Sequence, residues 1–159
     1  GASILNVHAA GGCAMMRAAA EAVRQEAAKS GKERPLVTAV TILTSIDQDV
    51  FNNEVGIPGS LQDRVTAWAL LAKEAGLDGV VASPKEIAAI RSACGPGFVI
   101  ITPGVRPAGS AVNDQKRTMT PGEAIRLGAT YLVVGRPVTA APDPVKAVQD
   151  ILKEIKEIH

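Results

Sequence analysis

The sequence predicts an α/β protein built from five successive strand–helix units, and two observations support this fold class. Short apolar runs rich in Val and Ile alternate with longer amphipathic stretches along the whole chain. Within the short runs, polar and apolar residues do not alternate strictly, which is typical of parallel strands buried on both faces. The expected strands are Ile4–Ala9, Leu36–Leu43, Gly79–Ala82, Phe98–Ile101 and Tyr131–Val134.

The stretches between these strands have the start signals of helices. Ser60 is placed to cap the second helix, while Thr120 and Asp143 each precede a proline at the first helical position. The segment Ile46–Gly56 is ambiguous between a helical turn and a loop. The expected helices are Cys13–Lys29, Leu61–Ala75, Pro84–Cys94, Pro121–Leu127 and Pro144–Ile158.

The polar residues favour a barrel over an open sheet. Thr44, Ser83, Thr102 and Arg136 lie at the carboxyl ends of successive strands, where (β/α)8 barrels place their sites. An open doubly wound sheet concentrates such residues at one switch point. A complete barrel has roughly 250 residues. We therefore expect residues 1–159 to form a single domain, the carboxyl-terminal portion of a (β/α)8 TIM barrel that supplies about five of its eight units.

Composition narrows the classes of partner. Seventeen basic and sixteen acidic residues nearly balance, and no basic block or aromatic ladder is present, so we expect no nucleic acid partner. No apolar run has the length of a membrane span, so no membrane partner is expected. Cys13 and Cys94 lack metal-ligand spacing, which argues against a metal site and favours a reducing cytoplasm.

Two arginines near strand ends indicate a phosphate ester as ligand. Arg106 lies in the loop Thr102–Ser110, and Arg136 follows Gly135 at the end of the last strand. Arginine offers a planar fork of donors to phosphate oxygens, and glycine allows backbone N–H groups to approach the same anion. His8 lies within a buried strand pattern and has no Cys or carboxylate nearby. We expect it to be a hydrogen-bonded core residue.

Six motifs occur in an order that resembles the orotidine 5′-phosphate decarboxylase family. The motifs are Asn6–Gly12, Val40–Ser45, Leu77–Ser83, Thr102–Ser110, Asp114–Arg117 and Val134–Pro137. The resemblance covers essentially the whole chain. It implies the fourth to eighth strands of the barrel and the last reaction of UMP synthesis, the conversion of OMP to UMP and CO2.

The resemblance also implies roles for individual residues. Thr44 matches the hydroxyl residue that hydrogen-bonds the pyrimidine, although an ordinary strand-end hydroxyl would look the same. Arg106 matches an arginine near the phosphate, and Gln115 matches a glutamine that bridges phosphate and base from a mobile loop. A solvated loop residue is the alternative for each. Gly135, through its backbone N–H, and Arg136 match the main phosphate clamp.

The catalytic motif of the family, Asp-x-Lys-x-x-Asp at the end of the third strand, is absent from this sequence. We therefore expect a fragment that has no catalytic residues of its own and is inactive alone. The resemblance implies no metal and no organic cofactor. It implies three partners: the nucleotide OMP or UMP, the missing amino-terminal segment of the barrel, and a second subunit in a homodimer. The alternative function is a non-catalytic phosphate-binding or assembly module, a partial barrel completed by another chain.

Overall fold

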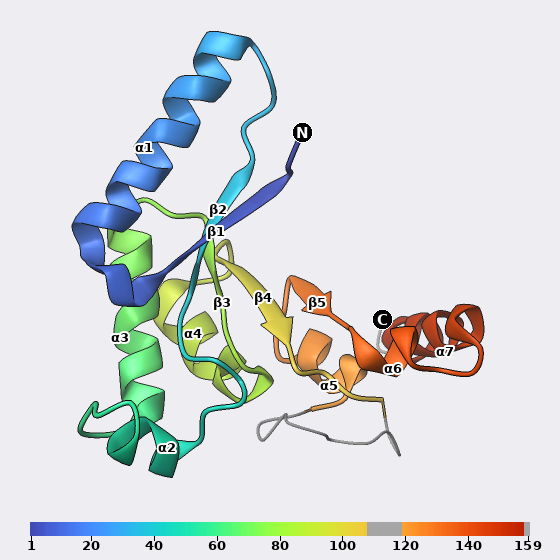
Figure 1. Ribbon diagram of the computed structural model, residues 1–159. Helices are drawn as coiled ribbons and strands as arrows, with labels where there is room; N and C mark the ends of the chain where they lie inside the picture. The colour runs from blue at the N-terminus through green and yellow to red at the C-terminus, as the bar shows by residue number, and fades with distance from the viewer. Residues whose placement is uncertain (108–118, 158–159) are drawn as a thin grey trace.

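The computed structural model describes residues 1–107 and 119–157, and within them five parallel strands form one sheet (Figure 1). Neighbouring strands pair in chain order, from β1 to β5. The strands are β1 (Ile4–His8), β2 (Leu36–Val40), β3 (Gly79–Val81), β4 (Val99–Pro103) and β5 (Tyr131–Val133). Each lies within or overlaps a predicted strand.

This strand order confirms the predicted fold class. In a doubly wound sheet the spatial order of the strands reverses at a switch point. Here each new strand is added beside the preceding one. Helices α1 (Gly12–Ser30), α3 (Leu61–Glu74) and α4 (Ile87–Cys94) cover one face of the sheet (Figure 1). The described residues therefore form five consecutive βα units of a (β/α)8 barrel.

The remaining helices are shorter, apart from the last. They are α2 (Gln48–Asn53), α5 (Pro121–Arg126), α6 (Arg136–Thr139), α7 (Pro144–Lys156) and two 3-10 turns, η1 (Ala9–Gly11) and η2 (Pro84–Glu86). The predicted caps are confirmed, since the side chains of Ser60, Thr120 and Asp143 each accept a backbone N–H of the following helix. The short helix α6 was not predicted.

The ambiguous segment after β2 is an ordered helical turn, α2. Asp47 caps it by accepting the N–H of Val50 at 3.0 Å. The side-chain amides of Gln48 and Asn52 both donate to the carbonyl of Gly59, at 2.9 and 3.0 Å. Phe51 is completely buried beneath them. These contacts tie the loop that follows β2 to the start of α3.

The main core lies between the sheet and its covering helices. Residues of β2, β3 and β4 that face this layer alternate with residues that face the opposite side of the sheet. Residues that contribute buried side chains to the core include Met16, Val37, Ala39, Val65, Val80, Ile87, Ile90 and Ile100. We call the sheet face opposite these helices the inner face.

The expectation that all five strands are buried on both faces is wrong for β1 and β5. On β1, Ile4 is 38% exposed, and on β5, Tyr131 and Val133 are 46% and 50% exposed. Each of these strands pairs on one side only within the described residues. No described helix covers the inner face of β1 or β5. Two strands with the sequence pattern of buried strands are therefore exposed on this face.

Arg91 joins two loops at the amino-terminal edge of the sheet. Its Nη1 donates to the carbonyls of Gly95, Pro96 and Phe98 at 2.8, 2.8 and 2.7 Å, and its Nη2 donates to that of Gly128 at 2.6 Å. The first three carbonyls precede β4 and the fourth precedes β5. One guanidinium therefore fixes the starts of two neighbouring strands relative to each other.

A second link at this edge joins Arg34 to Asp78. Their two hydrogen bonds measure 2.8 and 2.6 Å, and the Asp78 carboxylate also accepts the N–H of Val37 at 2.7 Å. The hydrogen bond from Arg34 is the main cause that lowers the pKa of Asp78 below its usual value, and the bond from Val37 adds to it. The link connects the start of β2 to the start of β3.

Replacing Arg91 should destabilise the fold. In Arg91→Met, we expect the free energy of unfolding to fall by about 2–4 kcal/mol, because bonds to charged donors are worth about 1.5–3 kcal/mol each and partly exposed carbonyls regain water. Urea denaturation measures the loss. The control is Arg126→Met, at an exposed arginine with no side-chain hydrogen bond within the described residues, which should change stability by less than about 0.5 kcal/mol. Equal losses in both variants would contradict the stabilising role of the Arg91 hydrogen bonds.

The Asp78 link should make stability depend on pH. Because folding lowers the pKa of Asp78, the stabilisation is present above the unfolded-state pKa of about 4 and is lost as the pH falls through the folded-state pKa. We expect Asp78→Asn to be less stable than the parent at pH 7, with the difference shrinking at about pH 3. Chemical denaturation at both values measures this. Arg34→Met should reproduce the effect, and a difference independent of pH would refute it.

Candidate functional site

The strand-end polar residues lie along the carboxyl-terminal edge of the sheet. Thr44 follows β2, Ser83 follows β3, Thr102 lies near the end of β4 and Arg136 follows β5. Because all five strands are parallel, their carboxyl ends meet at this one edge. The sequence prediction of a shared edge is confirmed for these four residues.

A cavity of about 250 Å³ opens at this edge across β2, β3 and β4. Thr44, which is only 8% exposed, contributes to its wall. The cavity is mainly apolar, with two hydroxyl side chains. Ligand sites are typically apolar hollows with a few polar groups, and this cavity has that character. The lining residues are Val40, Ile42, Leu43, Thr44, Ser45, Val81, Ala82 and Pro103.

The backbone around Thr44 is held at both ends. Upstream, the N–H and the hydroxyl of Thr41 donate to the carbonyl of Val81 at 3.0 and 3.1 Å. Downstream, the N–H of Ile46 donates to the carbonyl of Leu43 at 3.0 Å, which closes a turn. Thr44 is therefore a fixed part of the cavity wall.

Arg106 is buried, with 8% of its surface exposed. Its backbone N–H donates to the carbonyl of Met119 at 2.9 Å, and Val105 forms a β-bridge with Met119. Its Nη1 donates to the carbonyl of Val105 at 2.8 Å. The alternative of a solvated loop residue is wrong for Arg106. Burial of a guanidinium is costly, which makes a structural or ligand-binding role necessary.

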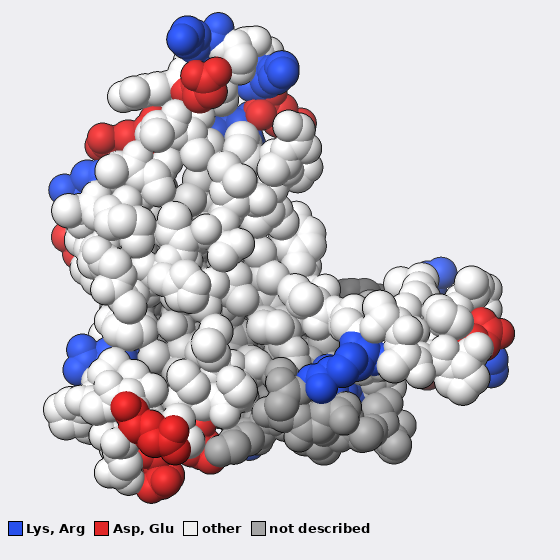
Figure 2. Space-filling model, in the orientation of Figure 1, with Lys and Arg blue, Asp and Glu red and all other residues white. Residues whose placement is uncertain are grey.

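Arg136 begins α6, and Gly135 precedes it as the capping residue. Both are exposed. Pro103 of β4 pairs with Val133 of β5, and each arginine lies three residues beyond its member of this pair. The register thus starts both arginine segments from the same level of adjacent strands. Basic surface is visible where α6 and α7 leave the rest of the molecule (Figure 2).

Two sequence expectations have other outcomes, and Thr102 shows a feature that the sequence analysis did not predict. Gln115 and the loop 108–118 lie outside the described residues, so their roles remain predictions. Sequence analysis predicts a hydrogen-bonded core residue at His8, but within the described residues its side chain is exposed and makes no hydrogen bond. Thr102 is fully buried, and its hydroxyl oxygen has no partner within them. Neither feature is visible in sequence patterns.

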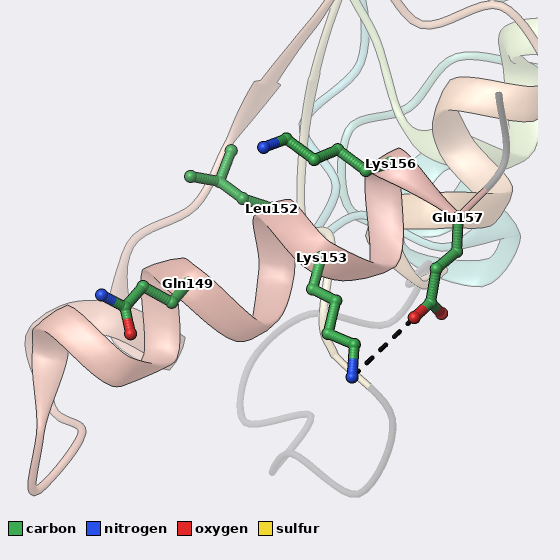
Figure 3. A pocket seen from close by; sticks show the side chains of 5 residues that line it. All are labelled: Gln149, Leu152, Lys153, Lys156 and Glu157. Carbon is green, nitrogen blue, oxygen red and sulfur yellow. Dashed lines mark ion pairs between the residues drawn. The ribbon is translucent and has the colours of Figure 1, made fainter.

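A hollow of about 380 Å³ along α7 is a different kind of surface (Figure 3). Four of the five lining side chains come from α7, and the fifth belongs to the residue that caps its carboxyl end: Gln149, Leu152, Lys153, Lys156 and Glu157. The ion pair between Lys153 and Glu157, at 3.9 Å, joins two exposed side chains and contributes little stability. None of the predicted site residues lies here, so the hollow is not the candidate site.

Two kinds of feature are not found among residues 1–107 and 119–157. No group of three or more His, Cys, Asp or Glu side chains is arranged to hold a metal ion. Within the same ranges, no helix has both the length and the apolar character needed to cross a membrane.

Curated relatives match nearly the entire chain. A protein named orotidine 5′-phosphate decarboxylase from Moorella thermoacetica is 62% identical over 158 residues, which cover 99% of this chain and 63% of the relative. A protein of the same name from Syntrophomonas wolfei is 54% identical over 97% of this chain and 65% of its own length. The chain thus spans less than two thirds of the length of these relatives.

Solved structures also align with nearly the entire chain. An uncharacterized conserved protein from Geobacillus kaustophilus aligns with a TM-score of 0.78 at 40% identity, over 98% of this chain and 64% of that one. Orotidine 5′-phosphate decarboxylase from Lactobacillus acidophilus aligns with a TM-score of 0.77 at 36% identity, over 96% and 63%. The sequence profile of the orotidine 5′-phosphate decarboxylase / HUMPS family matches residues 1–151. The chain therefore belongs to this family.

Proposed function

We propose that this chain forms the nucleotide-binding part of an orotidine 5′-phosphate decarboxylase, which converts OMP to UMP and CO2. The observation that supports this most strongly is the pair of arginines, one buried and one exposed, that extend from register-matched ends of β4 and β5. The names of the curated relatives favour the decarboxylase over the alternative of a non-catalytic phosphate-binding or assembly module.

In this proposal the two ends of the nucleotide meet different surfaces. Arg106, Arg136 and the backbone N–H of Gly135 bind the phosphate through charge-assisted hydrogen bonds. The pyrimidine lies at the cavity whose wall includes Thr44. Gln115 bridges the two ends from the loop 108–118. Binding energy from the phosphate then helps to orient the distant reacting carbon.

We further propose that additional βα units of the same barrel complete the sheet, so that residues 1–159 form one domain with them. Within the described residues, one edge of β1 and one edge of β5 are unpaired. Apolar side chains beside these edges and along α7 are exposed, among them Ile4, Tyr131, Val133, Val145, Val148 and Leu152. Such edges and patches are normally covered. The catalytic groups would come from these additional units.

Two further proposals concern the assembly and its environment. We infer a homodimer from the family resemblance. We place the protein in a reducing cytoplasm because both cysteines are free thiols, and Cys94 is buried, which raises its pKa and keeps it unreactive.

Joining this chain to the segment of the Moorella thermoacetica relative that it does not span tests the activity. We expect the joined protein to convert OMP to UMP, followed by the loss of orotate absorbance, and the 159-residue chain alone to show no turnover. Circular dichroism verifies folding of both. A folded joined protein that binds UMP without decarboxylating OMP would contradict the enzyme and favour the binding module.

In the same joined protein, Arg136→Ala should weaken UMP binding about 10- to 150-fold, because one charge-assisted hydrogen bond worth roughly 1.5–3 kcal/mol is lost. Titration calorimetry measures the affinity. Uridine, which lacks the phosphate, should bind Arg136→Ala and the parent equally. The matched control Arg126→Ala removes an exposed arginine away from the site and should leave UMP affinity unchanged. Unchanged UMP affinity in Arg136→Ala would refute the phosphate assignment.

A further inference from the structure

The inner face of β1 is polar at two successive positions. Leu5 lines a hollow together with side chains of α1, and Val7 packs against the main core, so both face the helices. Side chains alternate between the two faces of a strand. Asn6 and His8 therefore lie on the inner face, and both are exposed.

The neighbouring strand offers these two side chains no partner. Asn6 pairs in register with Thr38, and His8 with Val40. The hydroxyl of Thr38 donates to the carbonyl of Leu5 at 3.5 Å, and Val40 is apolar. Neither Asn6 nor His8 forms a side-chain hydrogen bond within residues 1–107 and 119–157.

The polar pair lies beside the candidate site. Val40 contributes to the wall of the cavity that Thr44 also lines. His8 is the register partner of Val40 on the adjacent strand and ends β1 at the same carboxyl-terminal edge. His8 is thus the neighbour, on β1, of a residue of the cavity wall, and Asn6 lies two residues before it on the same strand.

Closing the barrel would bury this pair. An amide and a neutral imidazole each provide a donor and an acceptor, and burying them without hydrogen bonds is costly. The described strands supply no such bonds to Asn6 and His8, while the second edge of β1 is unpaired among the described residues. A strand paired with this edge would lie beside both side chains, as β2 does on the other side.

We propose that Asn6 and His8 are positioning residues that hydrogen-bond polar or charged side chains on the inner face of the strand that pairs with the free edge of β1. The element that pairs with this edge is thus a parallel strand. Its side chains on the inner face can form hydrogen bonds, and it lies next to the cavity that Thr44 lines. This inference rests on the proposed function, because it requires the additional βα units.

The test uses the joined protein described above, with Asn6→Leu and His8→Phe as variants. Misplacing reactive groups by about 1 Å costs up to about 100-fold in rate. We expect each variant to lower kcat about 10- to 100-fold while KM and UMP affinity change less than about twofold. His8→Gln, which retains a donor and an acceptor, should recover part of the rate.

Val7→Ala is the matched control on the same strand. It removes packing on the helix-facing side, so it should lower the melting temperature without changing kcat. If kcat also falls in Val7→Ala by the same factor, loss of β1 packing explains the effect and the proposal is overturned. Unchanged kcat in His8→Phe and Asn6→Leu overturns it as well.

Nitrogen NMR of the His8 ring gives a readout that does not depend on turnover. In the joined protein we expect one fixed tautomer, and in the 159-residue chain an average of both, with His159→Gln used to assign the signals. Averaged tautomers in the joined protein would overturn the proposal. An inactive joined protein in which His8 has a fixed tautomer would instead count against the decarboxylase and in favour of the polar strand contact.

Discussion

The parallel pairing of five consecutive strands in chain order is the constraint on which the rest of the structure depends. It brings every strand-to-helix connection to one edge of the sheet. Thr44, Arg106 and Arg136 are far apart in sequence, yet each follows a strand that ends at this edge. The register between β4 and β5 then aligns the two arginine segments.

The two edges of the sheet use polar groups for different purposes. At the amino-terminal edge, Arg34 and Arg91 bond to a carboxylate and to backbone carbonyls within the chain, so their donors serve stability. At the carboxyl-terminal edge, buried Arg106 and the cavity wall at Thr44 lie where barrels bind their ligands. Loss of stability and loss of binding are therefore expected from different sets of substitutions.

Local signals in the sequence were sufficient for the strands, most helices and the caps, because these depend on neighbouring residues. The short helix α6 was missed, since Arg136 and Pro137 resemble the end of a strand. The exposure of β1 and β5 and the unpaired state of His8 were also missed. Burial depends on what covers a strand, and periodicity alone does not encode that. The sequence predicted that the site residues lie at the carboxyl-terminal edge of the sheet. It did not predict the burial of Arg106, which accompanies the bridge between Val105 and Met119.

The two sheet edges that are unpaired within residues 1–107 and 119–157 differ in chemistry, and this difference limits how the sheet is completed. The inner face of β1 presents Asn6 and His8, whereas that of β5 presents Tyr131 and Val133. A strand with apolar inner side chains beside β1 would leave Asn6 and His8 without hydrogen-bond partners. A strand with charged inner side chains beside β5 would place those charges against apolar groups and remove their water. Specificity arises when the wrong partner is penalised. The polar pair therefore discriminates against joining β1 to β5 of a second copy and favours a strand able to hydrogen-bond beside the site.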